Sequence, residues 1–152
     1  GIADRHDKRV ALLFLDMDDF KKSNDSFGHL TGDLLLKSVA ERVTQCLRTT
    51  DTVCRRSGDE FLILLSEIEH PEDAILVARQ ILSATAAPQK INDNDITLAA
   101  SIGISVYPDD GVDATTLMTC ADSAMYIAKQ SGPNQFYYSG SPYPGKVESL
   151  CR

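Results

Sequence analysis

The chain has 152 residues and a mass of 16.6 kDa, a length that fits one domain with a single core. Its formal net charge of −7 disfavours broad contacts with nucleic acid or anionic membranes, which need clustered Lys and Arg, so any phosphate ligand must be held locally. No apolar run approaches the roughly 20 residues that span a bilayer, and the first residues lack the apolar core of a secretory signal. We expect a cytoplasmic domain that contacts neither nucleic acid nor membrane directly, either by itself or as the cytoplasmic part of a longer, membrane-anchored protein.

The cysteines do not form a metal-binding or redox motif. The chain has four of them, without CxxC spacing, and its three histidines show no ligand spacing beside them, so zinc is not expected. An even number permits disulfides. We interpret the cysteines as reduced thiols that act as small apolar side chains.

The first half of the chain predicts a buried strand followed by a helix. Residues 9–15 form a continuous apolar run, typical of a central strand buried on both faces, and the run stops at Asp16. Between residues 31 and 48, apolar side chains recur four apart, which predicts an amphipathic helix with Asp33 in its first turn.

A β-hairpin is predicted next. Residues 52–56 and 61–66 flank a turn-like break at residues 57–60, which is typical of two strands joined by a tight turn. The acidic pair Asp59-Glu60 would therefore lie at the hairpin tip.

The second half predicts two more helices and two more strands. A helix is expected over residues 71–86, with proline in its first turn, and a long strand interrupted by Gly103 over residues 96–107. A third helix over residues 114–130 ends at a glycine, and residues 135–138 form the last strand.

The resulting order is β-α-β-β-α-β-α-β. This alternation predicts an α+β sandwich of the ferredoxin-like type, with a sheet of mixed direction and the helices packed on one face. We expect one domain over residues 1–138, followed by a loose, turn-rich tail over residues 139–152.

Two acidic segments suggest a metal site. Residues 16–19 read Asp-Met-Asp-Asp at the end of the first strand, and they would meet Asp59-Glu60 if the two strands are neighbours. Converging carboxylates repel one another unless a cation compensates them, and Mg²⁺ prefers such oxygen ligands and binds phosphates. Phosphoryl-transfer sites are built in this way. On spacing alone, the plainer interpretation, solvated acids at strand ends, is favoured.

A series of ordered motifs adds a family resemblance. The motifs are DMDDFK (16–21), ND (24–25), GHLTGD (28–33), RSGDEF (56–61), SIG (101–103) and ADSAMYIAK (121–129). In this order and spacing they resemble the GGDEF family of diguanylate cyclases, from residue 9 to about residue 138. In that family two GTP molecules, one on each of two facing domains, condense to cyclic di-GMP and pyrophosphate. The resemblance implies a palm-like fold related to nucleotidyl cyclases, with a mostly antiparallel sheet, and a transient or linker-driven homodimer.

The resemblance also implies a metal and catalytic set. Asp16 and Asp59 correspond to carboxylate ligands of Mg²⁺, or alternatively Mn²⁺; Met17 corresponds to a backbone carbonyl ligand, and Glu60 to a further acid. Asp59 or Glu60 would assist removal of the ribose 3′ proton, and the sequence leaves open which of them does, or whether a metal-bound water does. Gly58 would keep the backbone thin where the nucleotide approaches.

Further positions are implied to bind the substrate. Asn24 and Asp33 correspond to the pair that reads guanine, and their hydrogen-bonding groups suit its edge. Capping of a turn and a helix is the alternative for this pair. Lys21 and Lys129 correspond to residues that hold triphosphate oxygens, with solvated surface lysines as the alternative, and Phe20 joins the substrate-binding set.

An inhibitory site is implied by Arg48-Thr49-Thr50-Asp51. This RxxD pattern lies at the family's distance before the hairpin tip and corresponds to the site of product inhibition. An arginine can fork onto guanine or phosphate, and an aspartate can accept from guanine. The alternative is helix-end chemistry, with Arg48 on the helix dipole and Asp51 capping the next turn.

Two positions depart from the family pattern. Ser57 replaces a glycine, which would cost about 1 kcal/mol if the backbone there needs positive φ. Pro133 replaces an arginine, and the lost phosphate contact is worth about 1.5–3 kcal/mol.

The positions that correspond to the metal ligands and to the guanine-reading pair are intact. We therefore expect a diguanylate cyclase. The alternatives are a degenerate module that binds GTP or cyclic di-GMP and regulates an attached domain such as a phosphodiesterase, or an interaction domain without a ligand.

Overall fold

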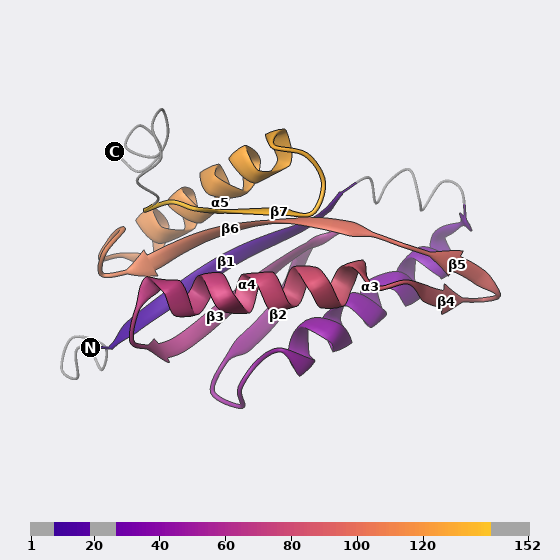
Figure 1. Ribbon diagram of the computed structural model, residues 1–152, viewed down its shortest axis with the longest axis horizontal. Helices are drawn as coiled ribbons and strands as arrows, with labels where there is room; N and C mark the ends of the chain where they lie inside the picture. Colours follow the sequence, from indigo (N-terminus) through magenta and orange to yellow (C-terminus); the bar gives the residue numbers. More distant parts are fainter. Residues whose placement is uncertain (1–7, 19–26, 141–152) are drawn as a thin grey trace.

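The computed structural model describes residues 8–18 and 27–140. A five-stranded sheet in the order β2-β3-β1-β6-β7 forms its centre (Figure 1). Its strands are β1 (Arg9–Asp18), β2 (Thr52–Ser57), β3 (Glu60–Ile68), β6 (Ala99–Tyr107) and β7 (Gln135–Tyr138). Only the pair β6 and β7 is parallel in this sheet, so the prediction of a mostly antiparallel α+β fold is confirmed.

Strand β1 lies at the centre because it is apolar on both faces. Successive side chains of a strand point to opposite faces, so Leu13 and Leu15 enter one core while Leu12 and Phe14 enter another. Helices α3 (His29–Gln45) and α4 (Pro71–Ala86) cover the first face, and α5 (Ala114–Gln130) covers the second (Figure 1). The expectation that the helices share one face is therefore wrong, because a strand buried on both faces needs cover on both.

Two element boundaries also differ from the prediction. Helix α3 begins at His29, so Asp33 lies in its second turn and not its first. The strand predicted over residues 96–107 is β6, which begins at Ala99, and an unpredicted short hairpin of β4 (Gln89–Ile91) and β5 (Asn94–Ile96) precedes it. Asn92 and Asp93 make its two-residue turn at φ 49° and 65°, the left-handed region that such turns require.

Helix α5 packs unusually close to the sheet at Gly103 of β6. A Cβ at this position would lie 2.0 Å from the carbonyl oxygen of Ala121 and 2.2 Å from the nitrogen of Met125. Only glycine allows this approach, which explains the glycine inside a predicted strand. The helix begins at the cap Asp113, whose carboxylate accepts from the Thr116 N–H at 2.8 Å, and its last turn carries Lys129.

Two observations bear on the class of protein. Cys46 and Cys54 are free thiols, whereas Cys120 is disulfide-bonded, so the expectation of reduced thiols is wrong for Cys120. Within the two described ranges, no helix has the length and apolarity needed to cross a bilayer.

Candidate active site

The end of β1 and the tip of the β2–β3 hairpin lie side by side. Asp16 pairs with Glu60 across the antiparallel β1 and β3 strands. The N–H of Met17 donates to the carbonyl of Asp59 at 3.2 Å, while the Met17 side chain is buried in the core. The predicted convergence of the two acidic segments is therefore present in the backbone register.

The hairpin tip depends on Gly58. Its φ of +48° lies in the region that favours glycine, and an added Cβ would meet nothing within 4 Å. The tip is further fixed by the Arg55 side chain, whose Nε donates to the Gly58 carbonyl at 2.7 Å. Ser57 does not have a positive φ, so its Cβ introduces no backbone strain.

Asp16 is a buried carboxylate with incomplete compensation. Its Oδ2 lies 2.7 Å from the Lys129 Nζ, whereas its buried Oδ1 has no hydrogen-bond partner within the described part of the chain. Burial raises the pKa of Asp16 to about 6, against the hydrogen bond from Lys129, and the charges of Asp59 and Glu60 add to the rise. Burial lowers the pKa of Lys129, but the hydrogen bond and charge of Asp16 outweigh it and the net shift is upward.

These residues fit a divalent cation in part. Over residues 8–18 and 27–140, no three His, Cys, Asp or Glu side chains are already gathered as a metal site. A buried carboxylate oxygen without a partner is nevertheless costly, and a hard cation with oxygen ligands would remove that cost. In this arrangement Lys129 supplies the positive charge beside Asp16.

Sequence reasoning counted Asp18 in the first acidic segment but gave it no individual role, although it lies one strand period beyond Asp16. Its carboxylate accepts from the Ser101 hydroxyl at 2.8 Å and from the Asn134 N–H at 3.3 Å. These bonds tie the end of β1 to β6 and to the turn between α5 and β7. The two-residue period of the strand, which places Asp16 and Asp18 on one face, was the available signal.

Sequence reasoning also missed Arg56. Its guanidinium lies 5.0 Å from the centre of the Phe14 ring and 3.6 Å from the Glu60 carboxylate. Arg56 precedes the hairpin tip on β2, and nothing in the sequence shows that its side chain reaches β1.

Asp33 lies beside the hairpin, on the opposite side of the sheet from Lys129. It lines a cavity of about 210 Å³ between α3 and the β2–β3 hairpin, together with Arg55 and Phe61 among others. Asp33 therefore borders this cavity from the second turn of α3. Three predicted substrate-binding residues lie outside the described residues: Phe20, Lys21 and Asn24.

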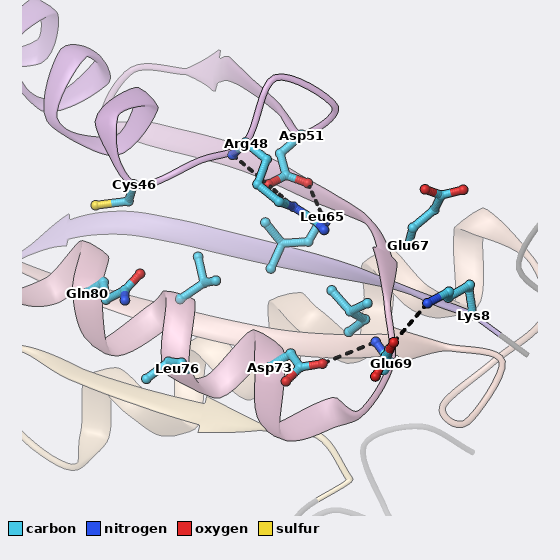
Figure 2. Close-up of a pocket in the computed structure, with 12 residues that line it drawn as sticks. Lys8, Cys46, Arg48, Asp51, Leu65, Glu67, Glu69, Asp73, Leu76 and Gln80 are labelled. Atoms are coloured by element: carbon cyan, nitrogen blue, oxygen red, sulfur yellow. Dashed lines mark hydrogen bonds and ion pairs between the residues drawn. The ribbon is translucent and has the colours of Figure 1, made fainter.

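The predicted inhibitory pair lies at the other end of the hairpin (Figure 2). The Asp51 carboxylate accepts from the Arg48 N–H at 2.9 Å, from the Arg48 side chain at 3.2 and 3.1 Å, and from the Ser66 N–H at 3.2 Å. The Arg48 guanidinium also donates to the Ser66 carbonyl. Burial raises the pKa of Asp51, but these hydrogen bonds outweigh it and the net shift is downward. Asp51 thus closes the turn after α3, as the alternative interpretation expected.

A cavity of about 470 Å³ adjoins this pair (Figure 2). Its lining includes apolar side chains, and its charged lining is more acidic than basic: the cations are Lys8 and Arg48, and the carboxylates are Asp51, Glu67, Glu69 and Asp73. The Lys8 ammonium already pairs with Glu69 at 3.0 Å.

Comparison with known families decides which kind of domain this is. A family model described as "Diguanylate cyclase, GGDEF domain" matches residues 2–135. The chain belongs to the GGDEF domain family of diguanylate cyclases. The GGDEF family of nucleotidyltransferases therefore accounts for the palm-like sheet and for the acids at its hairpin tip.

The chain is similar to parts of much longer proteins. It is 44% identical over 134 residues to the bifunctional diguanylate cyclase/cyclic di-GMP phosphodiesterase MucR of Pseudomonas aeruginosa, covering 88% of this chain and 19% of MucR. It is 38% identical over 128 residues to the cyclic di-GMP phosphodiesterase PdeR of Escherichia coli, covering 84% of this chain and 19% of PdeR. The chain thus spans about a fifth of each relative.

A solved structure shows the same fold. The GGDEF domain of TpbB (YfiN) from Pseudomonas aeruginosa superposes with a TM-score of 0.87 at 36% identity, covering 90% of this chain and 80% of that one. The predicted nucleotidyl-cyclase-like architecture is therefore confirmed.

Proposed function

We propose that this GGDEF domain is a diguanylate cyclase, which condenses two GTP molecules into cyclic di-GMP with release of pyrophosphate in the cytoplasm. The observation that carries the proposal is the buried, unpartnered Oδ1 of Asp16 beside the hairpin tip with Asp59 and Glu60. A structural carboxylate would have its oxygens satisfied, whereas a ligand-binding one is completed by its ligand. Each domain holds one GTP, so the reaction requires two domains facing each other.

The site residues divide the work between metal, proton and phosphate. Asp16, Asp59, Glu60 and the Met17 carbonyl would hold Mg²⁺ or Mn²⁺, which would neutralise the triphosphate and lower the pKa of the attacking 3′-hydroxyl. Asp59 or Glu60 accepts the 3′ proton. Lys129, which forms a 2.7 Å ion pair with Asp16, would be the residue that binds a triphosphate oxygen when a cation compensates Asp16 in its place.

Guanine recognition is assigned to the cavity beside α3. Asp33 lines it and can accept from the N1 and N2 hydrogens of guanine. Asn24 completes the pair, and Lys21 and Phe20 extend the contact to the rest of the nucleotide, as the family pattern implies.

Turnover of GTP by an enforced dimer tests the proposal. The domain is fused to a dimerising helix, because a monomer would keep its two GTP molecules apart whatever its chemistry. We expect slow production of cyclic di-GMP, lost in Glu60→Gln and increased in Pro133→Arg, which restores a phosphate-binding guanidinium. An enforced dimer that binds GTP with Mg²⁺ but makes no product, even as the Ser57→Gly/Pro133→Arg double variant, would overturn the cyclase assignment.

Product inhibition is proposed at the Arg48–Asp51 pair. The Arg48 side chain is 54% exposed and borders the 470 Å³ cavity, so it can turn part of its fork toward a phosphate or guanine. The acidic lining opposes a dianionic ligand, so we expect weak inhibition. Arg48→Ala should abolish cyclic di-GMP binding and leave GTP binding intact, as measured by calorimetry. Equal loss of both ligands would indicate one shared site.

A regulatory module is the second candidate. Pro133 removes a cation that the family pattern places near the phosphates, and a similar domain occurs in PdeR, which is named as a phosphodiesterase. Such a module would bind GTP or cyclic di-GMP and act on an attached domain. Binding without turnover in the enforced dimer distinguishes it from the cyclase.

A further inference from the structure

The side chain of Arg56 crosses the sheet from its edge toward its centre. Arg56 belongs to the edge strand β2, and β3 lies between β2 and β1. Its guanidinium nevertheless lies 5.0 Å from the ring centre of Phe14 on β1. Neighbouring strands are about 4.8 Å apart, so the side chain must extend across β3 to reach that ring.

The Phe14 ring is a fixed contact for the guanidinium. The ring is 1% exposed and belongs to the core under α5, so the surrounding side chains hold it in place. A cation over an aromatic face is attracted to the ring, which restricts a side chain that would otherwise sample many rotamers. The charge is therefore held at one place on the face of the sheet that carries α5.

This place continues the row of charged groups in the candidate active site. The row runs across the sheet as Arg56 on β2, Glu60 on β3, Asp16 on β1 and Lys129 on α5, joined by a 3.6 Å pair at one end and a 2.7 Å pair at the other. Two acids in the middle are thus flanked by a cation on each side.

The hydrogen-bonding capacity of Arg56 is largely unused. Its side chain is 46% exposed, and the 3.6 Å contact with Glu60 is an ion pair without a hydrogen bond. Over residues 8–18 and 27–140 the structure records no hydrogen bond from this guanidinium, whereas the Arg55 and Arg48 side chains donate to carbonyl oxygens. A fixed, exposed guanidinium with free donors can form two parallel hydrogen bonds to two oxygens of a phosphate.

We propose that Arg56 is a further substrate-binding residue, whose guanidinium contacts the phosphates of the bound GTP. The inference rests on the proposed function and adds a cation on the side of the row opposite Lys129. It gives the site a further phosphate-binding group despite the proline at position 133.

Competition binding with nucleotides of different phosphate content tests this role. A fluorescent GTP analogue is displaced by GTP or by guanosine in the presence of Mg²⁺. Arg56→Gln should weaken GTP by about tenfold to a hundredfold and change guanosine by less than about twofold, because only GTP carries the groups that Arg56 contacts. Arg56→Lys should fall between, since it keeps the charge but loses the planar fork.

Arg79→Gln is the matched control. Arg79 is also exposed and stacks on an aromatic ring, 5.5 Å from the centre of Phe136, but it belongs to α4 on the other face of the sheet. It should leave both affinities unchanged.

The outcomes separate this inference from the proposed function. An unchanged GTP affinity in Arg56→Gln, or an equal loss for GTP and guanosine, would overturn the phosphate contact while the cyclase assignment stands. A selective loss of GTP affinity without turnover in the enforced dimer would support Arg56 and overturn the cyclase. Absence of Mg²⁺-dependent GTP binding in the unmodified domain would overturn both.

Discussion

Two buried aspartates, one near each end of the β2–β3 hairpin, have pKa values that are shifted in opposite directions. Near the tip, Asp16 is 12% exposed at its side chain, has one oxygen without a partner among the described residues, and has its pKa raised to about 6. At the other end, Asp51 is 3% exposed, accepts from Arg48 and Ser66, and has its pKa lowered. Both side chains are largely buried, so their hydrogen-bond partners decide the direction in which the pKa shifts. An aspartate with both oxygens hydrogen-bonded stabilises the fold, whereas one with an unpaired oxygen is available to bind a ligand.

The largest expected effect is on GTP binding. Asp16→Asn should weaken Mg²⁺-dependent binding of a non-hydrolysable GTP analogue by about a thousandfold, because loss of a charged group in a buried site costs on the order of 4 kcal/mol. Asp51→Asn is the matched control at the other end of the hairpin and should stay within about twofold. Calorimetric titration measures both. Similar affinities for the two variants would erase the distinction between the two ends.

The free energy of unfolding should depend on the other aspartate: substitution of Asp51, not of Asp16, should destabilise the fold. Asp51→Ala leaves the Ser66 N–H and the Arg48 groups without their acceptor and should lower the free energy of unfolding by about 2–4 kcal/mol. Glu41→Ala, at an exposed position of α3, should change it by less than about 0.5 kcal/mol. Urea unfolding followed by circular dichroism supplies both values. A loss below 1 kcal/mol for Asp51→Ala would show that its hydrogen bonds do not anchor the turn.

Asp16→Asn should stabilise the metal-free domain while it disables binding. The pKa of Asp16 is about 6 in the folded chain and near its ordinary value of 3.8 when unfolded, so the folded state binds the extra proton between these values. The contribution of Asp16 to stability is therefore fully present below about pH 4 and is lost as pH rises through about 6. At pH 7 in chelator, Asp16→Asn should gain about 1–3 kcal/mol, since no ionised carboxylate is buried. The gain should vanish near pH 4 in the same unfolding experiment, and a gain independent of pH would assign it to another cause.

The smallest effect is expected at Ser57. Because Ser57 is exposed and lacks positive φ, Ser57→Gly relieves no strain and should change the rate of the enforced dimer by less than about twofold. A tenfold rise would show that the hydroxyl, not the backbone, obstructs the nucleotide.

The sequence predicted the features that depend on local pattern. The two-sided apolar character of β1, the hairpin and its acidic tip follow from residue spacing, and the register of β1 with β3 places Asp16 opposite Glu60. Contacts that depend on which elements face each other could not be predicted. Periodicity shows that a helix has an apolar face but not which side of the sheet it covers, so α5 was misplaced. The reach of Arg56 to Phe14 and the pairing of Lys129 with Asp16 depend on that same arrangement.

Gly103 lies outside the acidic signature but affects the active site. It has no side chain and no charge, yet the contact of β6 with α5 at this glycine sets how deeply the helix lies, and the last turn of that helix holds Lys129 beside Asp16. A larger residue there would lift α5 and separate the lysine from the acid, while every letter of the acidic signature stayed the same. Two proteins with identical signatures can therefore differ in their active-site electrostatics. Inheritance of activity within the family is better judged when the glycine under the helix is examined together with the acids at the tip.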